Sequence, residues 1–235
     1  MKKERKKRKR EKGVIREYFE LIVETAVYVF FVMTFVVQAF QIPTGSMENT
    51  LLIGDFLLVN KFIYAPYIWS WEKKILPLKE IKRKDIVVFK YPRDLSKDFV
   101  KRVIALEGEK VEIKNKQVYV NDKPLKEPYK IHTDETIYSK EEYNFYQSIL
   151  RDNYGPVTVP KGHLFVLGDN RDNSLDSRFW GFLPRSYVKG KPWLIYFSYR
   201  AERGAYLKTG ILDRIKKLVN FIPKARWKRI FKIIK

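Results

Sequence analysis

The feature that most constrains this chain is an apolar run, residues 21–40, directly behind a basic amino terminus. As a helix, twenty residues extend ~30 Å, about the thickness of the hydrocarbon layer of a bilayer. The buried helix of a soluble protein is seldom apolar on every face. The run therefore predicts a membrane-spanning helix. The positive-inside rule then places the amino terminus in the cytoplasm and everything after Phe40 on the outer face of the cell (inner) membrane.

A cleavable leader is the main alternative reading of this run. Residues 25–37 form an apolar core of suitable length, and Val37-Gln38-Ala39 resembles a small-x-small cleavage site. Sequencing the amino terminus of the mature protein distinguishes a cleaved leader from a retained anchor.

The positive charge is concentrated at the two ends of the chain. The 235 residues include 48 Lys and Arg against 27 Asp and Glu, a net charge of +21. Residues 1–12 carry +7 (nine basic, two acidic) and residues 208–235 carry +9 (ten basic, one acidic). Nucleic-acid enzymes more often spread basic charge over the folded domain. Basic tails suit an anionic membrane surface at least as well.

The segment after the apolar run reads as mainly β. Short stretches rich in branched residues predict strands at 86–89, 100–106, 111–113, 117–120, 163–167 and 194–199. Residues 126–160 are polar, aromatic and irregular, and read as a long insertion. We therefore expect a basic tail (1–17), a transmembrane anchor (18–40), an antiparallel β domain on the outer face (41–205) and a basic amphipathic tail (206–235).

The carboxyl tail alternates apolar and basic residues at roughly helical spacing. The apolar positions 211, 215, 218, 219 and 222 fit one helical face, and Pro223 interrupts it. A second stripe would comprise Trp227, Ile230, Phe231 and Ile234. A helix on a bilayer and a helix packed on the domain with a solvated basic face remain equally open readings.

Composition narrows the possible chemistry. Cysteine is absent and only two histidines occur, which excludes thiol nucleophiles, cysteine-ligated metals and three-histidine metal centres. Ser46, in the turn Thr44-Gly45-Ser46, is a weak candidate nucleophile when taken alone, because most such serines belong to turns or caps. Residues 168–178 combine five Asp or Asn with two Arg and two Ser. This predicts a dense hydrogen-bonded loop, structural or functional.

Three segments in order resemble the bacterial type I signal peptidases, which remove signal sequences from exported proteins. They are residues 41–55, residues 85–92 with 100–106, and residues 168–178 with Trp180-Gly181. Together they span most of the outer domain. Asn49 stands where the family usually has proline, and 105–109 depart from its usual Gly-Leu-Pro-Gly-Asp; both changes affect turns.

The resemblance implies a serine–lysine dyad in an antiparallel β domain of signal-peptidase type. Ser46 matches the nucleophile and Lys101 the general base, while Thr44 and the Ser46 backbone match the oxyanion hole. Matching positions imply that Ser174 orients the lysine, with support from Asp176, Arg178 and Asp169, and that the substrate pockets are lined by Ile42, Pro43, Met47, Leu51 and Val100.

The chemistry requires an uncharged lysine, whose ordinary pKa is ~10.4. Burial among apolar atoms lowers a lysine pKa, and strand alternation places Phe99 and Val103 on the Lys101 side, with Arg102 pointing away. The resemblance implies cleavage of preprotein signal peptides after small residues (Ala-x-Ala), with no metal or other cofactor and no nucleic-acid partner. A first alternative is a related self-cleaving repressor or processing protease with the same dyad; the membrane segment counts against the repressor. A second alternative is a membrane-tethered, non-enzymatic protein that binds lipid or nucleic acid through its basic tails.

Overall fold

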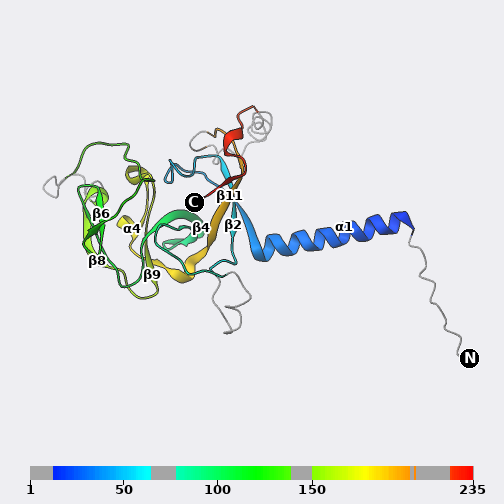
Figure 1. The fold of residues 1–235 in the computed structure, drawn as a ribbon, viewed down its shortest axis with the longest axis horizontal. Coiled ribbons are helices and arrows are strands. Elements are labelled where there is room, and N and C mark those ends of the chain that lie inside the picture. Colours follow the sequence, from blue (N-terminus) through cyan, green and yellow to red (C-terminus); the bar gives the residue numbers. More distant parts are fainter. Residues whose placement is uncertain (1–12, 65–77, 139–149, 202–203, 205–222, 235) are drawn as a thin grey trace, which may run out of the picture.

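The computed structural model describes residues 13–64, 78–138, 150–201, 204 and 223–234. Its main body consists of antiparallel sheets, and one long helix extends away from them (Figure 1). The mainly β fold expected for the outer domain is confirmed. The predicted strands coincide with β3, β4, β5, β6, β9 and β11, whose bounds follow.

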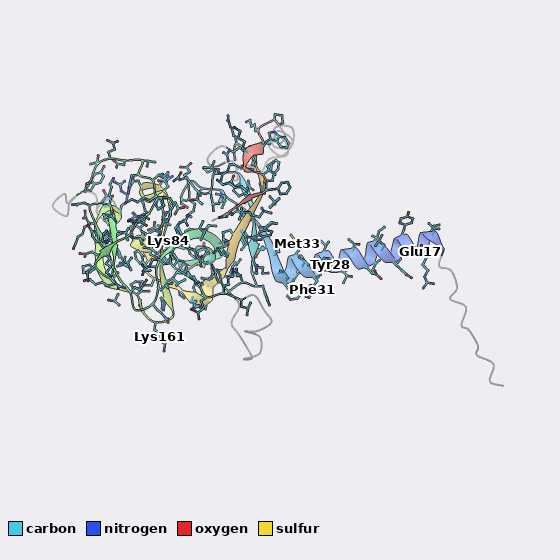
Figure 2. The ribbon with its side chains drawn as sticks, viewed as in Figure 1. Glu17, Tyr28, Phe31, Met33, Lys84 and Lys161 are labelled. Carbon is cyan, nitrogen blue, oxygen red and sulfur yellow. The ribbon has the colours of Figure 1, made fainter. Side chains whose placement is uncertain are left out.

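The projecting helix is α1 (Val14–Phe31), which continues as a π-helical turn, η1 (Val32–Val36). Residues Val14–Val36 are long and apolar enough to cross a membrane, and none of the most apolar stretch is buried by the rest of the protein. Figure 2 shows Tyr28, Phe31 and Met33 on this isolated helix, and all three are exposed. Such an apolar surface needs a non-aqueous environment.

The helical segment ends earlier than residue 40. Strand β1 (Val37–Gln41) begins directly after η1 and pairs antiparallel with β2 (Asp55–Asn60). The apolar residues 37–40 therefore belong to the sheet, because their backbone groups pair with β2. Because β1 follows η1 without an intervening loop, the first strand of the domain starts at the end of the helix.

The larger sheet has the order β1-β2-β11-β3-β4-β9-β10, and β12 pairs with β11. Its long strand β4 pairs with β3 along most of its length and with β9 at its carboxyl end. The remaining strands are β3 (Ile86–Tyr91), β4 (Asp94–Ala105), β9 (His163–Leu167), β10 (Leu183–Pro184), β11 (Val188–Ser198) and β12 (Lys232–Ile233).

The smaller sheet has the order β7-β6-β5-β8. Its core joins Val111, Val118 and Val120 to Phe165 and Leu167 of β9, which attaches it to the large sheet. Its strands are β5 (Lys110–Lys114), β6 (Gln117–Val120), β7 (Lys123–Pro124) and β8 (Tyr154–Thr158). Residues 126–160, expected to be irregular, thus supply a strand.

Short helices complete the described chain. They are η2 (Arg171–Asn173), α4 (Ser177–Trp180), η3 (Arg185–Tyr187) and η5 (Trp227–Arg229). The expected helical stripe at residues 227–234 is not formed, since η5 is one 3-10 turn and β12 is a strand. The segment instead hydrogen-bonds to β11. The expected face at 211–222 lies outside the described residues.

Candidate active site

Residues 42–54 form the loop between β1 and β2, called here the nucleophile loop, and it carries Ser46. Its turn is built from local bonds: Leu51 N–H donates to Met47 O at 2.8 Å, and Glu48 N–H to Gly45 O at 3.1 Å. Met47 and Leu51 are buried beneath it, in one apolar cluster with Ile42 and Leu57. The Ser46 side of the loop is thereby fixed facing strand β4.

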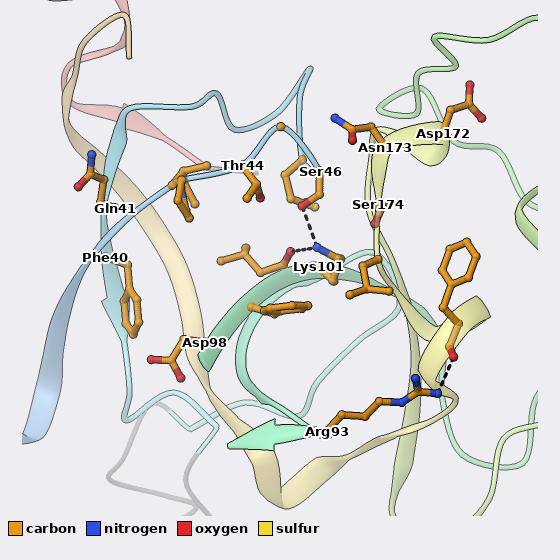
Figure 3. A pocket seen from close by; sticks show the side chains of 18 of the residues that line it. Phe40, Gln41, Thr44, Ser46, Arg93, Asp98, Lys101, Asp172, Asn173 and Ser174 are labelled. Carbon is orange, nitrogen blue, oxygen red and sulfur yellow. Dashed lines mark hydrogen bonds between the residues drawn. The ribbon is translucent and has the colours of Figure 1, made fainter. Parts of the chain in front are cut away.

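Lys101 lies on β4 opposite this loop. Its Nζ donates to Ser46 Oγ at 2.7 Å and to the Val100 carbonyl at 3.1 Å (Figure 3). The two residues are 55 positions apart in sequence. The structure therefore joins the amine and the hydroxyl that the motif resemblance paired.

The Lys101 side chain is buried, and the Phe99 ring lies beside its amine. Only 4% of the residue is exposed, and Nζ lies 5.2 Å from the centre of the Phe99 ring. Burial lowers the pKa of Lys101 to about 8; the Asp176 carboxylate raises it, the Arg178 charge lowers it and Asp169 raises it. With this pKa about one amine in ten is neutral at pH 7, because each unit changes the ratio tenfold.

The loop between β9 and α4, residues 168–176, packs against the nucleophile loop. The backbone N–H of Asn170 donates to the Ser46 carbonyl at 3.1 Å. A Cβ on Gly168 would lie 2.5 Å from that carbonyl oxygen and 2.2 Å from Ser174 Oγ. Glycine at this position thus permits the close approach of the two loops.

Asp176 and Arg178 form a buried pair that holds this second loop. Arg178 Nε donates to Asp176 Oδ1 at 2.8 Å and Nη2 to Oδ2 at 2.7 Å, and Gly168 N–H also donates to Oδ2. Burial alone would raise the pKa of Asp176, but the Arg178 charge and these hydrogen bonds hold it below its usual value. The carboxylate therefore stays ionised.

Asp169 pairs with Arg102, the neighbour of Lys101 on the opposite face of β4. Arg102 Nε and Nη2 donate to the two Asp169 oxygens at 2.8 and 2.7 Å, and Thr50 Oγ1 donates to Oδ2 at 2.5 Å. Arg102 thus links β4 to both loops without its charge lying beside the amine. The motif resemblance assigned no role to Arg102 or Thr50. Both residues lie within the motif segments 41–55 and 100–106, and this position was the only indication of a role that the sequence offered.

Thr44 and Ser174 both line the cleft at Ser46 (Figure 3). Ser174 is buried, and its hydroxyl faces the Asp176 carboxyl, whose pKa it helps to lower. The structure therefore places Ser174 near the dyad but does not bond it to the lysine amine.

The cleft has a volume of about 700 Å³ and runs along the loop and β4. Four of the five pocket residues expected from the sequence line it: Ile42, Pro43, Met47 and Val100. Leu51 does not, since its side chain is fully buried in the core below the loop. Figure 3 places Arg93 and Asp98 at the end remote from Thr44.

Asn49 stands where the family usually has proline, and its backbone conformation is one that proline cannot adopt. Its φ is 86°, a left-handed value that a proline ring cannot adopt. Its Nδ2 donates to the Tyr129 carbonyl at 3.0 Å. The turn after Ser46 therefore has a backbone conformation that proline at position 49 could not adopt.

Comparison with known proteins decides the family. The family model described as signal peptidase, peptidase S26, matches residues 15–197. The chain belongs to this signal peptidase family. Signal peptidase I of Aquifex aeolicus is 32% identical over 87% of this chain and 93% of its own length, and that of Pseudomonas aeruginosa is 34% identical over 78% and 72%.

A solved structure of signal peptidase I from Enterococcus faecalis is 38% identical over 48% of this chain and 97% of that chain, with a TM-score of 0.37.

Membership of the family makes the chain a signal peptidase, a serine endopeptidase. Together with the apolar helix α1, it indicates a membrane-anchored enzyme.

Proposed function

We propose that Ser46 and Lys101 are the catalytic dyad of this signal peptidase and that it cleaves signal peptides of exported preproteins after small residues. The observation that carries the proposal is the 2.7 Å contact between a buried lysine amine and the Ser46 hydroxyl. A lysine can serve as general base only when neutral, and burial lowers its pKa to about 8.

The reaction begins when neutral Lys101 accepts the Ser46 proton and Oγ attacks the scissile carbonyl carbon. The carbonyl becomes an oxyanion, which accepts hydrogen bonds from the Thr44 hydroxyl and the Ser46 backbone N–H. The lysinium then protonates the leaving amine, and the amide bond breaks. Water, deprotonated by the same amine, attacks the acyl carbon of the acyl-enzyme. The bond from that carbon to Ser46 Oγ breaks, and the lysinium returns its proton to Oγ.

Substrate choice follows from the walls beside the dyad. Ile42, Pro43 and Val100 line the cleft near Ser46, and they admit small side chains at the first and third positions before the cut. The β4 residues before Arg102 pair with β3 but not with β9, whose pairing with β4 begins at Arg102. An extended signal peptide would pair along this edge of β4.

Cleavage by variants tests the dyad. The detergent-solubilised full chain is incubated with a preprotein whose signal ends in Ala-x-Ala. Ser46→Ala and Lys101→Ala should each abolish cleavage. Ser186→Ala and Lys161→Ala, exposed residues away from the cleft, are the matched controls and should retain it. Full activity in either dyad variant would overturn the assignment.

We further propose that α1 spans the inner membrane with the amino terminus in the cytoplasm and the β domain outside. Nine basic residues in the first twelve support this orientation. The chain contains no cysteine, so a single introduced cysteine reports its own exposure. In intact spheroplasts an impermeant maleimide should label Lys161→Cys and should label Lys3→Cys only after lysis. The reverse pattern would refute the orientation.

A further inference from the structure

The last described segment, residues 223–234, lies beside the nucleophile loop, and we call it the carboxyl arm. We propose that this arm positions the nucleophile loop, and that Arg229 is the positioning residue through which it acts. This inference rests on the proposed role of Ser46. It concerns a segment beyond residue 197, where the match to the family model ends.

The arm is attached to the edge of β11. Tyr199 and Ala225 form an isolated bridge, and β12 pairs Leu194 with Ile233. Phe231 N–H donates to the Ile195 carbonyl at 2.8 Å. In Figure 1 the arm, in red, runs alongside β11, whose other edge pairs with β2. The arm therefore has a fixed position on β11, one strand away from β2, the strand into which the nucleophile loop leads.

Arg229 holds the far end of the nucleophile loop by a forked contact. Its Nη2 donates to Asp55 Oδ2 at 2.6 Å and its Nε to Oδ1 at 3.2 Å, while Nη2 also donates to the Thr50 carbonyl at 2.9 Å. Asp55 is fully buried, and its Oδ2 accepts the Leu52 N–H at 2.9 Å. Arg226 Nη1 lies 3.6 Å from Asp55 Oδ1, and Ser198 Oγ donates to that oxygen at 2.6 Å. Two arm guanidiniums thus face the buried carboxylate, and Arg229 makes the forked contact with it.

Two further arm residues contact the same loop. Arg226 Nη1 donates to the Ile53 carbonyl at 3.0 Å. Ile234 is buried in the apolar cluster that contains Ile42, Met47 and Leu51. The arm therefore supports the loop through polar contacts at its end and through an apolar contact beneath Ser46.

Thr50 transmits the position of the arm to the nucleophile. Its carbonyl accepts from Arg229, its hydroxyl donates to Asp169, and its N–H donates to the Met47 carbonyl at 3.1 Å. Met47 directly follows Ser46. Without Arg229 the buried Asp55 carboxylate lacks its forked partner, and the Thr50 carbonyl loses the hydrogen bond that ties the turn after Ser46 to the arm.

Arg229 acts on the nucleophile and not on the base. Its hydrogen bonds go to Asp55 and Thr50, and the groups that shift the Lys101 pKa are its burial, Asp176, Arg178 and Asp169. If Arg229 positions the nucleophile, its loss should lower the rate of the chemical step. The pH at which activity rises should stay the same.

The test compares three variants of the full chain in detergent: Arg229→Ala, Arg229→Lys and the control Lys228→Ala. Lys228 is the exposed neighbour of Arg229, and its removal changes the net charge equally. For each variant, kcat and KM are measured on an Ala-x-Ala peptide, and the folded fraction is taken from near-ultraviolet circular dichroism.

We expect Arg229→Ala to lower kcat per folded molecule about tenfold to a hundredfold, because displacement of a reacting group by about 1 Å has such an effect. KM and the midpoint of the pH–rate curve should stay as in the parent. The kcat of Arg229→Lys should lie between those of Arg229→Ala and the parent, and the kcat of Lys228→Ala should equal that of the parent. Unchanged kcat per folded molecule, or a shifted midpoint, would overturn the proposal.

If Arg229→Ala does not fold, Arg229→Lys carries the test, since full kcat in that variant contradicts positioning by the forked contact. Ser46→Ala is measured in parallel. Cleavage by Ser46→Ala refutes the dyad itself, whereas an inactive Ser46→Ala with fully active Arg229 variants refutes only the role of the arm.

Discussion

Replacing Phe99 with threonine should make the Lys101 amine a weaker catalyst at neutral pH. The Phe99 ring lies 5.2 Å from Nζ and lines the cleft, so a smaller, polar side chain admits water beside the amine. Burial is the largest cause of the drop in the Lys101 pKa from 10.5 to about 8. At about 1.36 kcal/mol per unit, that drop is on the order of 3 kcal/mol.

If water restores about one unit of the Lys101 pKa, the neutral fraction at pH 7 falls about tenfold. The assay is kcat/KM for an Ala-x-Ala peptide between pH 6 and 10. The acid limb should move to higher pH, and the rate lost at pH 7 should return at high pH. The control Phe182→Thr removes a half-buried ring that packs on the smaller sheet. A rate lowered equally at every pH, with an unmoved acid limb, would refute the reasoning.

Three more variants test other parts of the account. Lys101→Met should raise the free energy of unfolding at pH 7 by up to about 3 kcal/mol. The buried amine has a lower pKa in the folded state than in the unfolded state, so burial of its charge destabilises the wild-type fold. This destabilisation is complete below about pH 8 and disappears as the pH rises towards 10.5. Equal unfolding curves of the two proteins at pH 7 in denaturant would contradict this. Thr44→Val should lower kcat about a hundredfold with little change in KM if its hydroxyl binds the oxyanion, whereas an unchanged kcat excludes that role. Asn49→Pro should lower the melting temperature and kcat because proline cannot adopt a φ of 86°, and Asn49→Gly should retain more of both; equal values for the two variants would argue against this turn geometry.

Strands were the most predictable part of the fold. Branched residues mark β3, β5, β6 and β9 because such side chains pack well on a pleated surface, and that preference is local. The end of the helix at Val36 was less predictable. Three of residues 37–40 are apolar and continue the run of the helix, and they become a strand because β2 lies beside them.

The carboxyl arm shows the same limit. Trp227 and Phe231 have helical spacing, yet the unpaired edge of β11 provides backbone partners that a sequence pattern does not reveal. Likewise, the motif predicts Leu51 in a substrate pocket, whereas the turn after Ser46 directs its side chain into the core.

The candidate site was predictable only through motif resemblance. Nothing in composition distinguishes Lys101 from the other lysines, because its distinguishing property is burial beside Ser46. The Arg102–Asp169 and Arg229–Asp55 pairs depend on contacts between segments far apart in the sequence, which local patterns do not encode.

Direct titration of the Lys101 amine tests the central claim most closely. Lysines labelled with carbon-13 at Cε are followed by NMR across the pH range in the detergent-solubilised chain, and the Lys101 signal is assigned by its loss in Lys101→Arg. A transition at about pH 8 agrees with a buried amine that is partly neutral under working conditions. A transition near 10.5, the ordinary lysine value, would show that the amine is solvated and charged, and that it cannot be the base that activates Ser46.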